Sequence, residues 1–343
     1  DALDMADENG ESVAFTAAYS GNLMELASLI RLLESETNTE SVEILEEIGL
    51  LLKKDSDIYD NIERKHQILY TNQCLHNVKG RKIRISLSEL ALNLIQKAAW
   101  LRQHLQQQEW LDFNDQEGCY NSYYDNSSKP TDGFYNDRMH MMLTGQVFPI
   151  MNYVATDEQI RKITASADHY LYRPEIGGYR LNTDFKEIKT DLGRMFGFAY
   201  GEKENGAVFS HMTVMYANAL YRRGFAKEGW KALKTLSDTA LNFETSRIYP
   251  GIPEYFRADG RGVYHYLTGA ASWYMLTMVT EAFGVHGKAG DLVLYPKLLA
   301  EQFDENGHAS ITTQFADKTF QIHYDNPNQK DFGKYIIKKA TCD

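Results

Sequence analysis

The chain has 343 residues, of which 43% are hydrophobic, and a formal net charge of −11. This length predicts one large domain plus a small one, and the acidic balance argues against a nucleic-acid partner, which requires clustered Lys and Arg. Three widely spaced cysteines form no CxxC motif, so neither a disulfide framework nor a structural zinc site is indicated, which fits a reducing, cytoplasmic compartment. No apolar run approaches the about 20 residues that span a bilayer, and we expect no membrane segment and no metal site.

Apolar positions at helical spacing predict a helix over residues 12–34, with a buried stripe formed by Leu23, Leu26, Ala27, Ile30 and Leu33. A second helix is expected over 39–54, and the polar segment 55–84 is interpreted as an insertion. The clearest helix begins at Ser86, where Glu89 completes a capping box.

A long loop rich in Tyr, Asn and Asp follows over residues 112–138, and a loop of this length in a compact chain is usually functional. It could stack on sugar rings or form a packed lid. Residues 139–154 predict a buried helix that carries one amide, Gln146. Thr156 and Gln159 then cap a further helix that extends to about residue 171.

Further apolar helices are expected over 208–223, 227–243 and from Thr268 to about Gly284. Recurring pairs of apolar helices joined by polar loops predict an antiparallel helical array or toroid, whose loops at one end form the site. From residue 291 the apolar period changes to two, which predicts strands at 292–294, 311–315, 320–324 and 335–340, with a turn at Ala316–Lys318. We therefore expect a mainly helical domain over 1–290 and a small β-rich domain over 291–343.

Two stretches at helix starts suggest a binding site. In Gly201–His211, the carboxylate of Glu204 and the imidazole of His211 are seven residues apart and would face one side of a helix. The N–H groups and partial positive charge of a helix start suit an anionic ligand. Thr268 and Gly269 open another apolar helix. The structural alternative is a Gly-bounded loop with a capping carboxylate and a core histidine.

These stretches resemble successive motifs of the inverting phosphorylases of glycoside hydrolase family 94. The resemblance rests on Glu204–His211, on Leu267–Trp273, on Gln146 in its apolar helix, and on the opening Asp1–Asp4 followed by Gly10–Ser12. The motifs keep the family's order. The loop Pro250–Phe256 departs from the cellobiose-type pattern and is most similar to the 1,2-β-oligoglucan phosphorylases.

The resemblance implies an (α/α)6 barrel followed by an antiparallel, jelly-roll-like β piece. It also implies that the chain, which opens on Asp1 without an initiator Met, lacks the N-terminal β-sandwich and first barrel helices that carry the family's phosphate-binding arginines. The implied reaction is reversible phosphorolysis of β-1,2-linked glucooligosaccharides, with inorganic phosphate as co-substrate, no other cofactor, and α-glucose 1-phosphate as product. A homodimer is expected, as is common in the family.

The resemblance also assigns roles to individual residues. Asp1 matches the general acid, and phosphate is held by His211, Thr268 and Gly269. The sugar contacts it implies are Glu204, Gln146, Glu254 and Tyr255.

Each assignment has an ordinary alternative. Asp1 could be a surface residue, Glu204 a helix cap, and Gln146 an amide that bonds only to backbone. Three other functions stay open: phosphorolysis of another β-glucoside such as cellobiose, inverting hydrolysis with Asp1 and Glu204 as acid and base, and sugar binding without catalysis. A requirement for phosphate separates the phosphorylases from the hydrolase.

Overall fold

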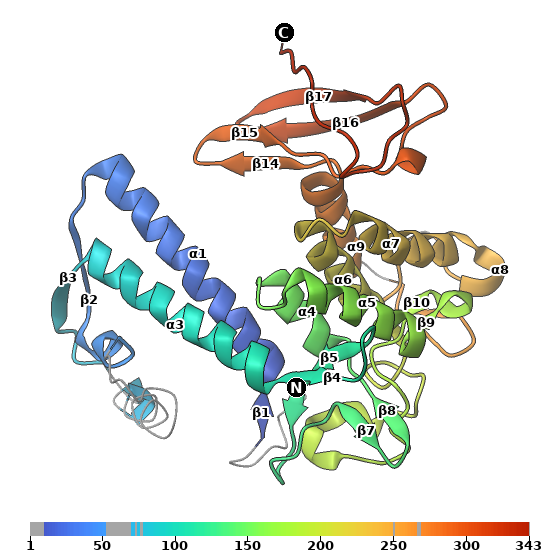
Figure 1. Ribbon diagram of the computed structural model, residues 1–343, viewed down its shortest axis with the longest axis horizontal. Helices are drawn as coiled ribbons and strands as arrows, with labels where there is room; N and C mark the ends of the chain where they lie inside the picture. The colour runs from blue at the N-terminus through green and yellow to red at the C-terminus, as the bar shows by residue number, and fades with distance from the viewer. Residues whose placement is uncertain are drawn as a thin grey trace. The chain divides into compact units, whose positions relative to one another are not determined.

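A computed structural model describes residues 10–52, 70–72, 74–75, 78–249, 251–265 and 269–342. The predicted general acid Asp1 and the predicted phosphate ligand Thr268 lie outside the described residues, as does most of the predicted insertion. The chain divides into two compact units, one formed by Thr16–Gln108 and the other by the residues before and after it. Both combine helices with small antiparallel sheets (Figure 1).

The unit Thr16–Gln108 is built on two helices, α1 (Val13–Thr37) and α3 (Leu87–Gln108). Their shared core comprises Leu23, Ala27, Ile30, Leu87, Ala91, Leu94, Ala98 and Leu101. The predicted stripe of α1 was correct at three of its five positions, whereas Leu26 and Leu33 are exposed. The predicted start of α3 is confirmed, since the Ser86 hydroxyl accepts a hydrogen bond from the Glu89 backbone N–H at 3.2 Å.

The helix predicted over 39–54 was wrong. Residues Ser41–Leu45 form strand β2, and a short 3₁₀ helix follows over Glu46–Leu50. β2 pairs antiparallel with β3 (Lys82–Ser86), with Val42 opposite Ile85. Both segments carry β-branched residues in alternation, and pairing between segments about forty residues apart cannot be read from local helical spacing.

The larger unit is organised around α6 (Ser210–Arg222), which packs against α4, α7 and α9 (Figure 1). α6 can occupy this position because most of its residues are buried, among them Tyr216, Ala217 and Leu220. The other helices are α4 (Thr144–Met151), α5 (Asp157–Tyr170), α7 (Ala226–Leu241), α8 (Phe243–Ser246) and α9 (Gly269–Leu276). α9 continues into a π-helical turn over Thr277–Ala282, and 3₁₀ helices lie at Pro174–Ile176, Thr190–Gly197 and Ala300–Gln302.

The predicted capping box of α5 is confirmed, since the Thr156 hydroxyl accepts from the Gln159 N–H while the Gln159 side chain accepts from the Thr156 N–H. The helix predicted over 139–154 is shorter, because its first residues belong to a strand. Short strands in this unit are β1 (Glu11–Ser12), β4 (Trp110–Asp112), β5 (Gly118–Tyr120), β6 (Tyr123–Tyr124), β7 (Gly133–Tyr135), β8 (Arg138–His140), β9 (Tyr172–Arg173), β10 (Gly178–Tyr179), β11 (Val208–Phe209), β12 (Tyr255–Phe256) and β13 (Gly262–Val263).

The Tyr-rich segment 112–138 folds around the buried carboxylate of Asp132. Asp132 accepts hydrogen bonds from the backbone N–H groups of Ser122 and Met142 and from the Thr131 hydroxyl. Burial raises the pKa of Asp132 to about 6. Tyr120 and Tyr123 are buried within this segment, whereas Tyr124 and Tyr135 are partly exposed, so stacking on a sugar stays a prediction for the latter two.

The C-terminal strands are β14 (Val285–Lys288), β15 (Asp291–Leu294), β16 (His308–Phe315) and β17 (Lys318–Asp325). The predicted hairpin is confirmed: Phe315 pairs with Lys318 across a two-residue turn in which Ala316 and Asp317 both have positive φ. The strand predicted at 335–340 was wrong, because this segment has no regular structure and its Ile336 and Ile337 are exposed.

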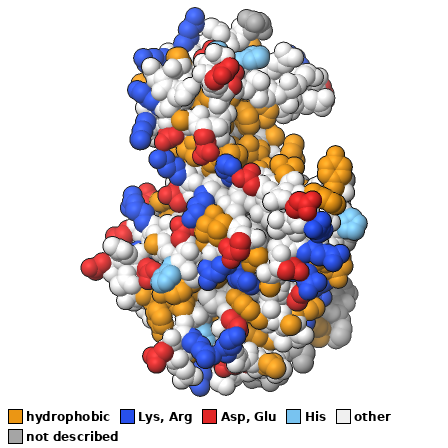
Figure 2. Space-filling model, turned by 90° about the vertical axis from the view of Figure 1, so that its right-hand side faces the viewer, with side chains coloured by type: hydrophobic (Ala, Val, Ile, Leu, Met, Phe, Trp, Pro, Cys, Tyr) orange, Lys and Arg blue, Asp and Glu red, His pale blue; other side chains and the backbone are white. Residues whose placement is uncertain are grey.

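On the face seen in Figure 2, basic and acidic side chains are interspersed rather than gathered by sign. In the part of the chain that the structure describes, no helix combines the length and apolarity needed to cross a membrane.

Candidate functional site

A three-stranded antiparallel sheet leads into the start of α6. β12 lies in its centre, with Phe209 of β11 opposite Tyr255 on one side and Val263 of β13 opposite Tyr255 on the other. The backbone N–H of Ser210 donates to the carbonyl oxygen of Glu254 at 2.9 Å. The sheet therefore fixes the hairpin that carries Glu254 and Tyr255 beside the first turn of α6.

His211 lies on that first turn and is half-buried. Its ring centroid is 5.7 Å from that of Trp273 in α9. Burial holds the pKa of His211 below its usual value. The Nε2 atom is buried and makes no hydrogen bond to any described residue, which leaves one strong hydrogen-bonding group for a ligand.

Gly269, the first residue of α9, lies against this imidazole. A β-carbon at Gly269 would stand 3.0 Å from Cε1 and 3.1 Å from Nδ1 of His211. Such contacts are shorter than a carbon side chain normally tolerates, so a glycine is what allows the start of α9 to approach the ring. The structure thus brings together two of the predicted phosphate ligands, each at a helix start whose N–H groups favour an anion.

The turn that precedes α6 is held by an amide that we did not predict. The buried Asn182 accepts from the Gly206 backbone N–H at 2.7 Å and donates to the Asn205 side-chain oxygen at 3.2 Å. Gly206 has a φ of +75°, a backbone conformation that is strained for a residue with a side chain. Asn182 and Gly206 together set the direction in which residues 202–205 project.

Glu204 projects from this turn toward Arg194, whose guanidinium lies 2.5 Å from Oε1. The other carboxylate oxygen is buried and has no hydrogen-bond partner in the described chain. Glu204 does not cap α6, since the residue before that helix is Phe209 and no side chain caps it. A buried carboxylate oxygen without a described partner can accept a hydrogen bond from a sugar hydroxyl.

Tyr255 is buried, and its hydroxyl donates to Oε2 of Glu202 at 3.2 Å. Burial and the Glu202 carboxylate raise the pKa of Tyr255 to about 12. Arg257 ion-pairs with the other oxygen of Glu202 at 2.8 Å. Glu254 is half-buried and uses its backbone groups in the sheet.

Gln146 is fully buried in α4 and bonds only to backbone. Its oxygen accepts from the Tyr120 N–H at 2.8 Å, and its NH₂ donates to the carbonyls of Tyr120 at 2.9 Å and Met142 at 3.1 Å. Both of its N–H donors are therefore used by backbone carbonyls. These contacts are those of an amide that bonds only to backbone, so Gln146 has no N–H donor left for a sugar.

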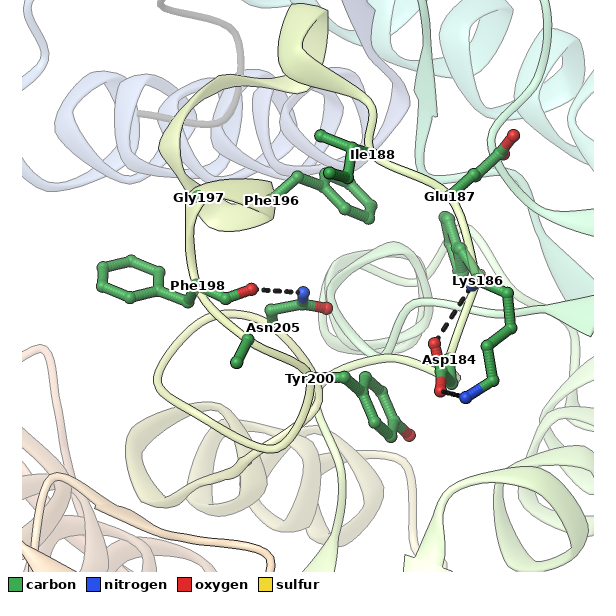
Figure 3. Close-up of a pocket in the computed structure, with 11 residues that line it drawn as sticks. Asp184, Lys186, Glu187, Ile188, Phe196, Gly197, Phe198, Tyr200 and Asn205 are labelled. Carbon is green, nitrogen blue, oxygen red and sulfur yellow. Dashed lines mark hydrogen bonds and ion pairs between the residues drawn. The ribbon is translucent and has the colours of Figure 1, made fainter.

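Two pockets in the larger unit are lined by described residues. The first, of about 390 Å³, lies between residues 184–188 and 196–205. Figure 3 shows the Asp184–Lys186 pair on one side, Phe196 with Ile188 on another, and the Asn205 amide directed at the Phe198 carbonyl. It contains none of the predicted site residues. The second, which we call the hairpin pocket, has about 440 Å³ and is lined by Arg257, Arg261, Gly262, Val263, Tyr264 and His265.

Asn182, Arg194, Glu202 and Arg257 contribute to the site and were missed from the sequence. They lie in loops without apolar periodicity, and their partners are between about 10 and 55 residues away. Within the described ranges, no group of three or more His, Cys, Asp or Glu side chains could hold a metal ion.

The sequence is similar to those of known proteins. Residues 87–284 match the model of the family described as the glycosyl hydrolase 94 superfamily, catalytic domain. Among curated proteins, the chain is similar to a cellobionic acid phosphorylase from Neurospora crassa, at 25% identity over 55% of this chain and 25% of that protein. It is also 24% identical to a 3-O-beta-D-glucopyranosyl-beta-D-glucuronide phosphorylase from Paenibacillus borealis, over 62% of this chain and 28% of that protein.

A solabiose phosphorylase from Paenibacillus borealis is 22% identical over 87% of this chain and 40% of that protein. The chain therefore spans between a quarter and two fifths of the length of these curated relatives.

Proposed function

Since the chain belongs to the glycosyl hydrolase 94 superfamily, we propose that it forms part of a phosphorylase that cleaves a β-glucoside with inorganic phosphate. The observation that carries the proposal is the contact between His211 and Gly269, which joins two helix starts around one buried imidazole nitrogen without a described partner. N–H groups at helix starts and a histidine form a suitable cradle for a phosphate anion.

In this reaction a phosphate oxygen attacks the anomeric carbon while the bond from that carbon to the leaving oxygen breaks. Phosphate is already an anion, so no second carboxylate is needed to deprotonate it, in contrast to an inverting hydrolase. We assign Asp1 as the acid that protonates the leaving oxygen and Thr268 as a further phosphate ligand. Both assignments rest on the sequence resemblance. Inversion at a β-linked glucose gives α-glucose 1-phosphate.

The sugar that leaves is proposed to contact Glu204, Glu254 and Tyr255. The free oxygen of Glu204 can accept a hydrogen bond from a sugar hydroxyl, and the Tyr255 hydroxyl, which donates to Glu202, can accept another through its oxygen. The first candidate substrates are β-1,2-linked glucooligosaccharides, on the strength of the Pro250–Phe256 loop. We further propose that the helices belong to an (α/α)6 barrel, that the C-terminal strands belong to a jelly-roll-like domain, and that the protein is a cytoplasmic dimer without a cofactor.

A second candidate is phosphorolysis of another β-glucoside. It is favoured by the names of two relatives, which specify cellobionic acid and a glucuronide. In both names the sugar bears a carboxylate. A substrate can combine a carboxylate with any linkage, so this candidate does not exclude a β-1,2 linkage.

The test is to incubate the full-length protein with β-1,2-glucooligosaccharides, with and without inorganic phosphate, and to assay glucose 1-phosphate. We expect phosphate-dependent release that Asp1→Asn and His211→Asn reduce by about 100-fold or more. His323→Asn, a change of an exposed histidine on β17, is the matched control. Release of free glucose without phosphate would make the protein a hydrolase, and sugar binding without turnover would leave it a binding protein.

A further inference from the structure

Two buried polar side chains join α6 to the end of α9, and the proposed reaction gives them no role. The amide nitrogen of Asn218 in α6 donates to the hydroxyl oxygen of Thr277, the first residue of the π-helical turn, at 3.1 Å. Both side chains are buried. A hydrogen-bonded pair in a core adds little net stability over an apolar pair of the same shape, so this pair calls for an explanation other than stability.

The pair lies two helical turns away from the candidate phosphate site along both helices. Asn218 follows His211 by seven residues, so the two side chains share one face of α6. Thr277 follows Gly269 by eight residues. At about 1.5 Å per residue, these steps correspond to about 10.5 Å and about 12 Å. α6 and α9 therefore run parallel, with one contact at their starts and the other two turns further on.

A parallel arrangement suits an anion site and is unfavourable without one. Each helix start carries a partial positive charge, and parallel helices place both charges at the same end, where they repel each other until an anion binds. Apolar contacts between the helices are not directional, so they specify the axial register poorly. A hydrogen bond is directional, and a buried polar side chain between helices can fix their register. The bond between Asn218 and Thr277 has the location and the geometry for this task.

The π-helical turn over Thr277–Ala282 adds a reason for such a bond. Its far end is anchored by the buried ion pair of Glu281 and Lys297 at 2.7 Å, and the Lys297 N–H donates to the Ala282 carbonyl at 2.9 Å. A π turn is wider than an α turn, with i→i+5 hydrogen bonds, so it changes the phase between this anchor and the start of α9. The anchor alone therefore does not determine where Gly269 lies. Asn218 holds the helix on the near side of the turn.

We propose that Asn218 and Thr277 are positioning residues of the phosphorylase reaction, because their hydrogen bond sets the register in which α6 and α9 present their first turns to phosphate. The inference rests on the phosphorylase function above and adds two residues that touch neither substrate. When the bond is lost, the start of α9 shifts along α6, and His211 no longer keeps its place against Gly269. Binding of phosphate then weakens, whereas the proposed sugar contacts, which lie on the turn before α6 and on β12, stay in place.

The first test separates register from stability. In the double variant Asn218→Leu with Thr277→Val, an apolar pair of similar shape replaces the polar pair, and no buried group is left unpaired. Its melting temperature should lie within about 5 °C of the wild type. In the full-length protein, initial rates should show KM for phosphate raised about tenfold or more, with KM for the sugar unchanged. An unchanged KM for phosphate in the folded double variant would overturn the proposal.

Single variants identify the hydroxyl as the group responsible. Thr277→Val should raise KM for phosphate by about the same factor as the double variant, because both remove the same bond. Thr277→Ser, which keeps the hydroxyl, should stay within about threefold of the wild type. Thr280→Val is the matched control, since the Thr280 hydroxyl bonds the Leu276 carbonyl in its own helix at 2.8 Å. If Thr277→Ser raised KM as much as Thr277→Val, the hydroxyl would not set the register and the proposal would fail.

A measurement without turnover distinguishes this proposal from the phosphorylase function. The protein is labelled with ¹³C at Cε1 of histidine, and the His211 resonance is the one that His211→Asn removes. Because the Trp273 ring lies 5.7 Å from the imidazole, a change of register alters this chemical shift. A shifted resonance in Thr277→Val but not in Thr280→Val, in a protein that cleaves no sugar with phosphate, would support the register bond and reject the phosphorylase. An unshifted resonance in Thr277→Val would overturn the proposal even in an active phosphorylase.

Discussion

The imidazole of His211 rests on the α-carbon of Gly269, so closely that a β-carbon there would lie 3.0 Å from Cε1. The two residues are 58 positions apart in the chain and belong to the first turns of two packed helices, α6 and α9. The position of the ring therefore depends on the absence of a side chain at residue 269.

Gly269→Ala tests this relationship. The added methyl group should displace the imidazole by a few tenths of an ångström or more, and kcat/KM for phosphate should fall about 10- to 100-fold, because small displacements of ligating groups are costly. Initial rates at varied phosphate concentration measure the effect. Gly197→Ala is the control, since a β-carbon there meets nothing within 4 Å. An unchanged KM for phosphate in Gly269→Ala would contradict the proposed cradle.

The pH dependence of stability tests the environment of His211. Burial lowers its pKa in the folded protein below the usual 6.5, so around pH 6 the unfolded chain binds more protons at this residue than the folded chain does. Its contribution is therefore complete above about pH 6.5 and is lost as the pH falls. We expect the melting temperature of the wild type to drop more steeply between neutral pH and pH 5 than that of His211→Asn. Parallel profiles would show that the histidine is not held neutral by burial.

Asn182→Ala tests the support of the turn before α6. The substitution leaves the buried Gly206 N–H without its acceptor, and an orphaned buried group costs about 1–3 kcal/mol. Urea denaturation should show this loss, and KM for the sugar should rise because Glu204 loses its fixed position. Asn242→Ala, which changes an exposed asparagine before α8, should alter the free energy of unfolding by less than about 0.5 kcal/mol.

Gln146→Met separates a structural amide from a sugar contact. Removing the amide leaves the N–H and C=O of Tyr120 unpaired in the core, so the free energy of unfolding should fall by about 2–5 kcal/mol. At a temperature where the variant is folded, KM for the sugar should stay within about twofold of the wild type, since Gln146 bonds only to the backbone of Tyr120 and Met142 and supports none of the proposed sugar contacts. A stable variant with a strongly raised KM would instead return Gln146 to the sugar site.

Local patterns predicted those parts of the fold that local forces determine. The caps at Ser86 and Thr156 and the turn at Ala316–Asp317 depend on residues within four positions of each other, and all three are confirmed. Strand β2 was predicted as helix because its stability comes from β3, about forty residues along the chain. A local hydrophobic pattern contains no information about a strand partner that far along the chain.

The residues of the candidate site also divide into those set by local motifs and those set by distant partners. His211 and Gly269 were recognised because each lies in a motif at a helix start, and the structure brings them into contact. Asn182 and Glu202 act through partners 23 or more residues away, in loops without a repeating pattern. Their roles could be found only after folding had placed those partners beside them.

The pairing within the sheet β11–β12–β13 allows the turn between β12 and β13 to change while the strands stay in place. Phe209, Tyr255 and Val263 stand in one row across its three strands, and hydrogen bonding fixes the spacing of that row. An insertion between Arg257 and Arg261 would lengthen the turn and reshape its pocket without moving the row. A one-residue insertion at Tyr255 would reverse which side chains face the site. The shape of this turn can therefore vary between related sequences while the start of α6, two residues beyond β11, keeps its place.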